Sequence, residues 1–235
     1  MKVLLSILLF VLSASLFAEL PVTDMHLHYK WSQQDVTTPE AALRQLDEAQ
    51  IVQGVVIGTP AELALLLARR APEKIVSIWS PYREGGDWSR WATDAAVVDS
   101  ARAALASGHY RGIGELHLVG GFAPRARPGD VLSRLLELAR EYDVPVLLHT
   151  EFSRPDRMLS LCSNHPHTRI VWAHAVAILQ PSEVSAVLEK CGNVSAGLAA
   201  RDPWRFVNNP ITDEQGKLLP DRRNLLLRYP DRFMV

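Results

Sequence analysis

Two histidines near the start of this 235-residue chain have a spacing that suits metal binding. His26 and His28 are two residues apart in residues 23–28, which follow a short apolar lead and are predicted to form a strand. Side chains two apart on a strand project from one face, so both imidazoles would point the same way. Neutral imidazoles are good ligands for zinc and similar divalent metals. Alone, the pair is weak evidence, because surface histidines at this spacing are common.

Further side chains of the same type end or interrupt later apolar segments, namely Glu115, His149 and His174. Each would need a partner if it were buried there. Taken singly, His149 could be a core histidine bonded to a backbone carbonyl, and Glu115 could pair with Arg111. Together with His26, these groups favour a shared site for one or two divalent metal ions, with Zn²⁺ preferred. A bound metal would lower the pKa of water and provide a hydroxide nucleophile.

Three other polar residues are candidates for substrate binding. His117 and Glu151 have the same strand parity as Glu115 and His149, so they could line the pocket or already lie in loops. Arg201 follows the seventh apolar segment, where it could bind a substrate carboxylate or be a solvated loop charge. Both alternatives remain open for all three residues.

The elements that would position these residues alternate between strand and helix. Strands are predicted at residues 23–28, 54–58, 74–79, 112–117, 144–149, 169–174 and 193–198, with an eighth beginning at 232–235. Helices are predicted at residues 38–50, 62–70, 89–107, 130–142, 156–163, 181–191 and 221–228. The rest is predicted to be irregular, including residues 29–36 and 199–220.

Eight short apolar strands in this alternation predict a (β/α)8 TIM-like barrel, in which the strands are buried on both faces. The carboxyl ends of barrel strands form the active-site face, where the candidate ligands fall. An open doubly wound sheet is the alternative fold. No glycine-rich phosphate fingerprint follows the first strand, which removes the usual support for a dinucleotide-binding version of that sheet.

Composition and charge restrict the classes of function. The chain is 48% hydrophobic, which suits one large domain over residues 19–235, and its net charge is −1. No basic excess favours nucleic acid as a partner, and a small-molecule substrate remains compatible with this charge. The sequence leaves open whether the chain forms a homo-oligomer.

The first 18 residues have the layout of a secretory signal peptide. Lys2 is followed by an apolar run over residues 3–12 and by small residues up to Ala18. An uncleaved anchor is the alternative, but the run is short for a membrane span of about 20 residues. We therefore expect an exported protein, periplasmic or secreted, with no membrane association after removal of the signal. Export permits a disulfide, yet two unpaired thiols are preferred for Cys162 and Cys191, which are both predicted on outer helices or their ends.

The combined motifs resemble the amidohydrolase superfamily, specifically the amidohydrolase-related and TatD-like metal-dependent hydrolases. The matching segments are residues 24–28, 114–115, 145–149 and 172–175. The resemblance implies a distorted barrel with one or two metals, usually zinc. It implies that His26 and His28 bind one metal, that Glu115 bridges, and that His149 and His174 bind the second. It also implies hydrolysis of a C–N, ester, lactone or related bond by metal-activated water.

One part of the family pattern is not matched. Members of the superfamily carry an aspartate just after strand eight, which acts as general base. Here the sequence ends at Val235, before the expected aspartate and the final helix, and Asp231 precedes the strand. We therefore assign no catalytic residue, and we expect a barrel that lacks the end of strand eight. The alternatives to a hydrolase are a non-oxidative decarboxylase and a truncated, non-catalytic metal-binding barrel.

Overall fold

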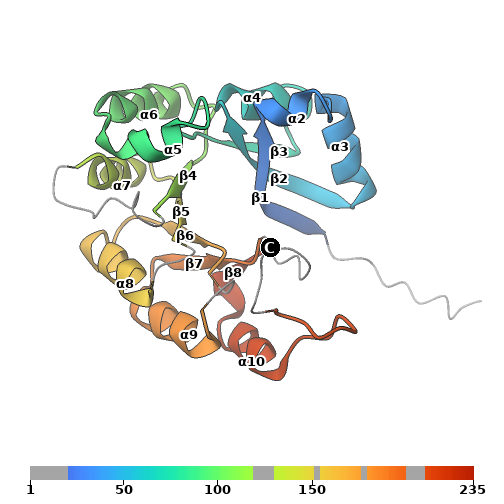
Figure 1. Cartoon of the computed structure of the whole chain (residues 1–235), viewed down its shortest axis with the longest axis vertical. Helices are drawn as coiled ribbons and strands as arrows, with labels where there is room; N and C mark the ends of the chain where they lie inside the picture. The colour runs from blue at the N-terminus through green and yellow to red at the C-terminus, as the bar shows by residue number, and fades with distance from the viewer. Residues whose placement is uncertain (1–20, 119–129, 151–153, 176–178, 200–209) are drawn as a thin grey trace, which may run out of the picture.

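Parallel strands make up the centre of the structure, a computed structural model that describes residues 21–118, 130–150, 154–175, 179–199 and 210–235. The predicted signal segment, residues 1–18, lies outside this part. The strands are β1 (Val22–Lys30), β2 (Ile51–Thr59), β3 (Ile75–Ile78), β4 (Ile113–His117), β5 (Val146–His149), β6 (Ile170–Ala173), β7 (Val194–Gly197) and β8 (Phe233–Met234). They form two sheets, β1-β2-β3 and β4-β5-β6-β7-β8, with every pairing parallel (Figure 1).

Helices cover the outside of the strands, as the predicted alternation requires (Figure 1). They are α2 (Trp31–Gln34), α3 (Pro39–Glu48), α4 (Glu62–Ala68), α5 (Asp87–Arg90), α6 (Ala96–Ala106), α7 (Val131–Glu141), α8 (Pro155–Asn164), α9 (Pro181–Lys190) and α10 (Pro220–Arg228), with 3-10 turns η1 (Trp91–Thr93) and η3 (Pro230–Arg232). The predicted cap Asp130 accepts a hydrogen bond from the Ser133 amide at 2.7 Å. In the described ranges, no helix has the length and apolar character needed to cross a membrane.

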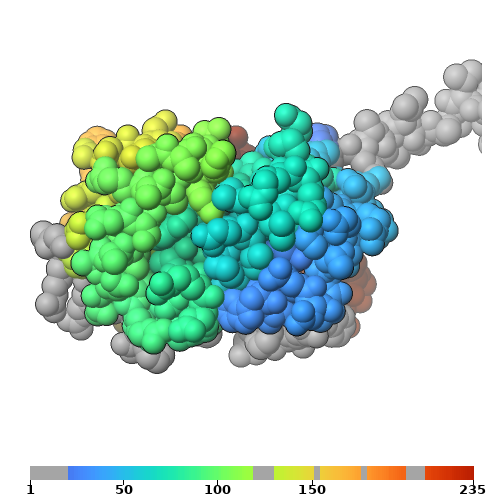
Figure 2. All heavy atoms as spheres, turned by 90° about the horizontal axis from the view of Figure 1, so that it is seen from above, coloured from blue at the N-terminus to red at the C-terminus, as the bar shows by residue number. Residues whose placement is uncertain are grey.

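The two sheets adjoin at both of their edges. Trp79, just after β3, forms a parallel bridge to Ile113 of β4. At the other edge the Met25 amide donates to the Val235 carbonyl at 2.6 Å, so the C-terminal residue lies beside β1 (Figure 1). In the space-filling view, the segments coloured blue to cyan lie directly against the green ones (Figure 2). The strands are therefore paired as two sheets and not as one continuous sheet, but together they surround one interior.

Apolar side chains from both sheets fill this interior. Val55, Ile57 and Ile78 of the first sheet pack with Leu147 and Val171 of the second. The larger core lies between the strands and the helices α6, α7, α8 and α9. This two-layer arrangement, strands inside and helices outside, is the α/β architecture predicted from the alternation.

Two local predictions were wrong. Residues 29–36 do not form only a loop, because β1 continues to Lys30 and α2 follows it. Tyr29 anchors this extension, since its ring is buried and its hydroxyl donates to the Thr37 carbonyl at 2.8 Å. The helix predicted at residues 89–107 is divided into α5, η1 and α6. Asp94 is extended there, and its carboxylate accepts from the Ala96 amide at 3.0 Å, which starts a new helix.

The preference for two unpaired thiols was also wrong. Cys162 in α8 and Cys191 after α9 form a disulfide, with their Cα atoms 5.7 Å apart. That separation lies within the usual range for a disulfide. The spacing of 29 residues along the chain does not predict the bond, because it depends on how α8 and α9 pack.

Loss of this disulfide should lower the stability of the fold measurably. It closes a loop of 29 residues, and a loop of that length corresponds to roughly 3.6 kcal/mol of unfolding free energy. We expect urea unfolding of the double variant Cys162→Ser, Cys191→Ser to give an unfolding free energy lower by about that amount, with a larger m-value because its unfolded chain is less compact. Wild type treated with reductant should match the double variant. Equal stability of the oxidised and reduced proteins would contradict the assignment.

Candidate metal centre

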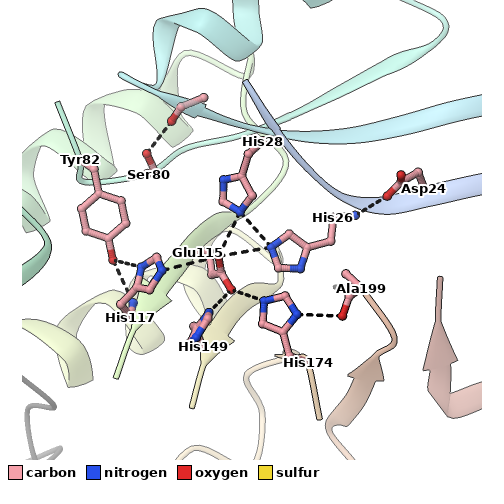
Figure 3. Close-up of polar contacts among 11 residues, drawn as sticks. Asp24, His26, His28, Ser80, Tyr82, Glu115, His117, His149, His174 and Ala199 are labelled. Carbon is pink, nitrogen blue, oxygen red and sulfur yellow. Dashed lines mark hydrogen bonds and ion pairs between the residues drawn. The ribbon is translucent and has the colours of Figure 1, made fainter. Parts of the chain in front are cut away.

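A single buried carboxylate, Glu115 in β4, is surrounded by imidazole nitrogens (Figure 3). Its Oε2 lies 3.3 Å from His26 Nε2 and 3.1 Å from His28 Nε2. Its Oε1 lies 2.7 Å from His149 Nδ1 and 3.3 Å from His174 Nε2. All the ligand candidates predicted from the strand ends therefore converge on one point, at the carboxyl ends of β4, β5 and β6.

The alternation of side chains along β1 aims its two histidines at this point. Tyr29 faces the helices and packs with the core around α4. His28 pairs in register with Ile57, which faces the interior of the strands. His26 lies on the same side as His28, with the two Nε2 atoms 3.1 Å apart. Its amide donates to Asp24 Oδ1 at 3.0 Å, which fixes the backbone at the start of the pair.

Two backbone features aim the residues on β4 and β6. Gly114 has φ +142°, and a Cβ atom at this position would lie 2.6 Å from the carbonyl oxygen of Leu147 on β5. Glycine is therefore what allows β4 to approach β5 so closely beside Glu115. His174 follows β6 directly and has φ +54°, a left-handed conformation that non-glycine residues adopt rarely. The turn points its ring toward Glu115 (Figure 3).

The hydrogen bonding of His174 shows that the site suits a cation. Its Nδ1 lies 2.9 Å from the Ala199 carbonyl oxygen, which can only accept, so Nδ1 carries the proton. In the neutral ring, Nε2 then carries a lone pair, and it faces Glu115 Oε1 at 3.3 Å. Two acceptors at this distance repel each other unless a cation or an added proton lies between them. The donor set of imidazoles and one carboxylate is the set that zinc prefers.

The surroundings of Glu115 favour its charged form, and the burial of His28 favours its neutral form. Burial alone would raise the pKa of the Glu115 carboxyl, but its contacts with the side chains of His149, His174, His26 and His28 hold that pKa well below its usual range. Burial lowers the pKa of His28, although its hydrogen bond to Glu115 acts in the opposite direction. A charged carboxylate beside neutral imidazoles is the form in which these groups bind divalent metals.

His117, predicted as a possible substrate contact, lies at the edge of the same cluster. Its Nε2 is 3.8 Å from Glu115 Oε2. Its ring stacks between Trp88 and His149, with both centroid distances 4.7 Å. The Tyr82 hydroxyl accepts from the His117 amide at 2.9 Å and lies 3.1 Å from His117 Nδ1. The strand parity of His117 with Glu115 therefore agrees with its place beside the cluster, and its contact with a substrate stays a prediction.

The ligand atoms fall into two groups of three, each with its atoms within 4.8 Å of one another. These groups are His26, Glu115 and His174, and Glu115, His117 and His149. Glu115 is shared, as the bridging role implies. His28 contacts both His26 and Glu115, so it adjoins the first group.

Two of the predicted substrate residues are not described by the structure, and two aromatic residues that were not predicted lie against His117. Glu151 and Arg201 lie outside the described residues. Tyr82 and Trp88, in the segment after β3, were missed by the sequence reasoning, because nothing in the periodicity of a loop says where it folds.

The pKa of His117 predicts a pH-dependent stability of the metal-free protein. Burial lowers this pKa from 6.5 to about 4. Between these values the unfolded chain binds a proton that the folded chain does not, so unfolding free energy should rise with pH and level off above 6.5. The full contribution is about 3 kcal/mol. Urea unfolding across this range should show it, and His117→Phe, which keeps a ring but cannot titrate, should show a smaller rise. Equal slopes for both proteins would contradict it.

Comparisons with known proteins agree with this geometry. The family profile described as Amidohydrolase matches residues 23–232, nearly all of the chain. A search of curated proteins gave no match.

Three solved structures have the same fold, each at low sequence identity. A TIM-barrel protein from Bordetella bronchiseptica aligns with TM-score 0.57 and 15% identity, over 83% of this chain and 67% of that one. A TatD homolog from Escherichia coli K12 aligns with TM-score 0.54 and 21% identity, over 75% and 67%. Dihydroorotase from Campylobacter jejuni aligns with TM-score 0.52 and 14% identity, over 91% and 68%. These likenesses support the barrel rather than the doubly wound sheet.

Proposed function

Because this chain belongs to the amidohydrolase family, we propose that it is a hydrolase of a small molecule that uses one or two zinc ions. The observation that carries the proposal is the convergence of imidazole nitrogens from His26, His28, His149 and His174 on the buried Glu115 carboxylate. Such a cluster would be costly to bury without a cation, because acceptors face one another across it.

The residues of the site would hold the metal in a prepared geometry. Glu115 would bridge, with the imidazoles on either side of its two oxygens. The Ala199 carbonyl fixes the tautomer of His174 and so leaves Nε2 available as a ligand. When bound, an ion of this kind lowers the pKa of water toward neutrality and thus supplies a nucleophile at neutral pH. We assign no general base.

The residues that lie beside the cluster, or are predicted to, are proposed to bind the substrate. His117 lies beside the metal residues, and Tyr82 holds its ring from the opposite side. Glu151 and Arg201 are proposed for the same role from their places in the sequence, just after the segments that form β5 and β7. Different substrates would be distinguished by these groups rather than by the metal residues.

Activity measured before and after removal of metal tests the proposal. The purified chain should hydrolyse at least one compound in a panel of amides, esters and lactones. A chelator should abolish that activity, and added zinc should restore it. Hydrolysis that persists after complete removal of metal would contradict the mechanism. Release of carbon dioxide from a carboxylic acid, with no hydrolysis of the panel, would favour a decarboxylase.

We also propose that the protein is exported. Residues 1–18 have the charge and apolar pattern of a signal peptide. The disulfide between Cys162 and Cys191 supports an oxidising compartment, because such bonds are rare in the cytosol. Expression of the full chain in a bacterium should give a protein in the periplasm or medium whose N-terminal sequence starts after the signal. A cytosolic protein that retains residues 1–18 would contradict this.

A further inference from the structure

A partly buried lysine and an exposed tryptophan form a pair at the edge of the metal centre. The Lys30 ammonium lies 5.6 Å from the centroid of the Trp88 ring. Trp88 also contacts the Tyr82 ring, with centroids 6.3 Å apart, and the His117 ring, which is stacked on it at 4.7 Å with the planes 13° apart. The pair therefore adjoins the group formed by Glu115, His117 and His149.

The position of Lys30 follows from β1. Lys30 is the last residue of the strand and is two residues from His28, so the two side chains leave the same face. Its register partner is Thr59, two residues beyond the partner of His28.

Trp88 is partly exposed and lies in a turn that its neighbour Asp87 stabilises. Its neighbour Asp87 is buried and accepts hydrogen bonds from the backbone amides of Arg83 and Glu84, at 2.9 Å and 3.2 Å. The Arg90 guanidinium also donates to Asp87, at 3.1 Å. These bonds hold residues 83–90 together as one compact turn. The indole remains 42% exposed, which is high for a side chain of this size.

Lys30 has the capacity to bind an anion. Within the described ranges, its ammonium forms no ion pair with a carboxylate, unlike Lys74, which pairs with Asp47 at 2.5 Å. A contact with the face of an indole uses the charge but leaves the N–H donors of the ammonium available. A single ammonium matches one negative charge, so a carboxylate fits this position better than a phosphate.

We propose that Lys30 and Trp88 form a subsite for an anionic part of the substrate, a proposal that rests on the proposed hydrolase function. A substrate carboxylate would pair with the Lys30 ammonium, and adjoining apolar atoms would pack on the exposed part of the Trp88 indole. The substrate would thus be a small carboxylic acid, and the bond to be cleaved would lie toward His117 and Glu115. Lys30 and Trp88 would thus select the substrate, whereas the imidazole cluster would carry out the reaction.

Binding of a simple aromatic carboxylate tests this subsite. Benzoate carries both features, and benzamide has the same shape without the charge. Isothermal titration calorimetry of the purified, zinc-treated chain should show benzoate binding more tightly than benzamide. Lys30→Met should weaken benzoate by about tenfold, and Lys30→Arg should recover most of the affinity. Trp88→Ala should weaken both compounds. Lys190→Met, the same change at an exposed lysine at the end of α9, should have no effect.

The metal content of every sample, measured in parallel, separates this proposal from the proposed function. Benzoate affinity that is unchanged in Lys30→Met at full zinc content would overturn the subsite, since the carboxylate would then bind the metal instead. Absence of benzoate binding to the wild type at millimolar concentration would also overturn it. Lys30-dependent binding to a wild type that holds no metal would support the subsite and refute the metal-dependent function.

Discussion

Replacement of Glu115 by glutamine should abolish zinc binding and hydrolysis while leaving the fold in place. The variant keeps the size of the side chain but removes the negative charge that two pairs of histidines contact. Loss of an outer partner of a metal ligand typically costs 10- to 100-fold in affinity, so loss of the central carboxylate should cost at least about 100-fold. Activity should fall in parallel, because the nucleophile depends on the metal.

A surface carboxylate provides the control for this experiment. Glu141 is exposed and pairs with Arg102 at 2.7 Å, a type of contact that is worth at most about 1 kcal/mol. Glu141→Gln should therefore keep full zinc content and activity. Zinc affinity is measured by competition with a chromophoric chelator, and folding by circular dichroism without metal. A Glu115→Gln protein that binds zinc as tightly as Glu141→Gln would show that Glu115 is not a ligand.

The second large effect is expected from Gly114→Ala, although Gly114 is not itself one of the candidate metal-binding residues. The new Cβ would lie 2.6 Å from Leu147 O and 2.7 Å from Leu147 Cβ, so β4 would have to move away from β5. The positive φ of +142° adds strain for any residue with a side chain. We expect a loss of about 3 kcal/mol in unfolding free energy. Zinc affinity should fall as well, because Glu115 and His149 lie on the separated strands.

Another glycine shows whether the effect is specific. Gly192 has no atom within 4 Å of an added Cβ, and Gly192→Ala should therefore change neither property. Urea unfolding gives the stability of the two variants, and the chelator competition gives their zinc affinity. If Gly114→Ala were as stable as the wild type and bound zinc equally well, the close approach of β4 and β5 would not be what positions Glu115.

The ligand cluster could be predicted because parallel strands bring their carboxyl ends to one face. Once the alternation of strands and helices was recognised, His149 and Glu115 had to lie near each other, although 34 residues separate them along the chain. Strand parity then extended the set to His117. These inferences depend only on the period of a strand and on the shared direction of the strands.

Other features could not be predicted, because they depend on packing that has no sequence period. The fold of the segment after β3 brings Tyr82 and Trp88 onto His117, and loop sequences carry no comparable signal. The break before α6 depends on Asp94, whose carboxylate starts the new helix. The bond between Cys162 and Cys191 depends on the contact of α8 and α9. For the loop residues and the disulfide, tertiary contacts decide the outcome, whereas the break at Asp94 is a local contact that outweighs the helical pattern.

The metal content of the purified protein tests the central claim most directly. The chain should be purified without chelators, incubated with zinc, freed of excess metal and analysed by plasma mass spectrometry beside Glu115→Gln. We predict at least one zinc ion per wild-type chain and almost none in the variant. A folded wild-type protein that holds no stoichiometric divalent metal, with His26 and His28 intact, would contradict the assignment of a metal centre.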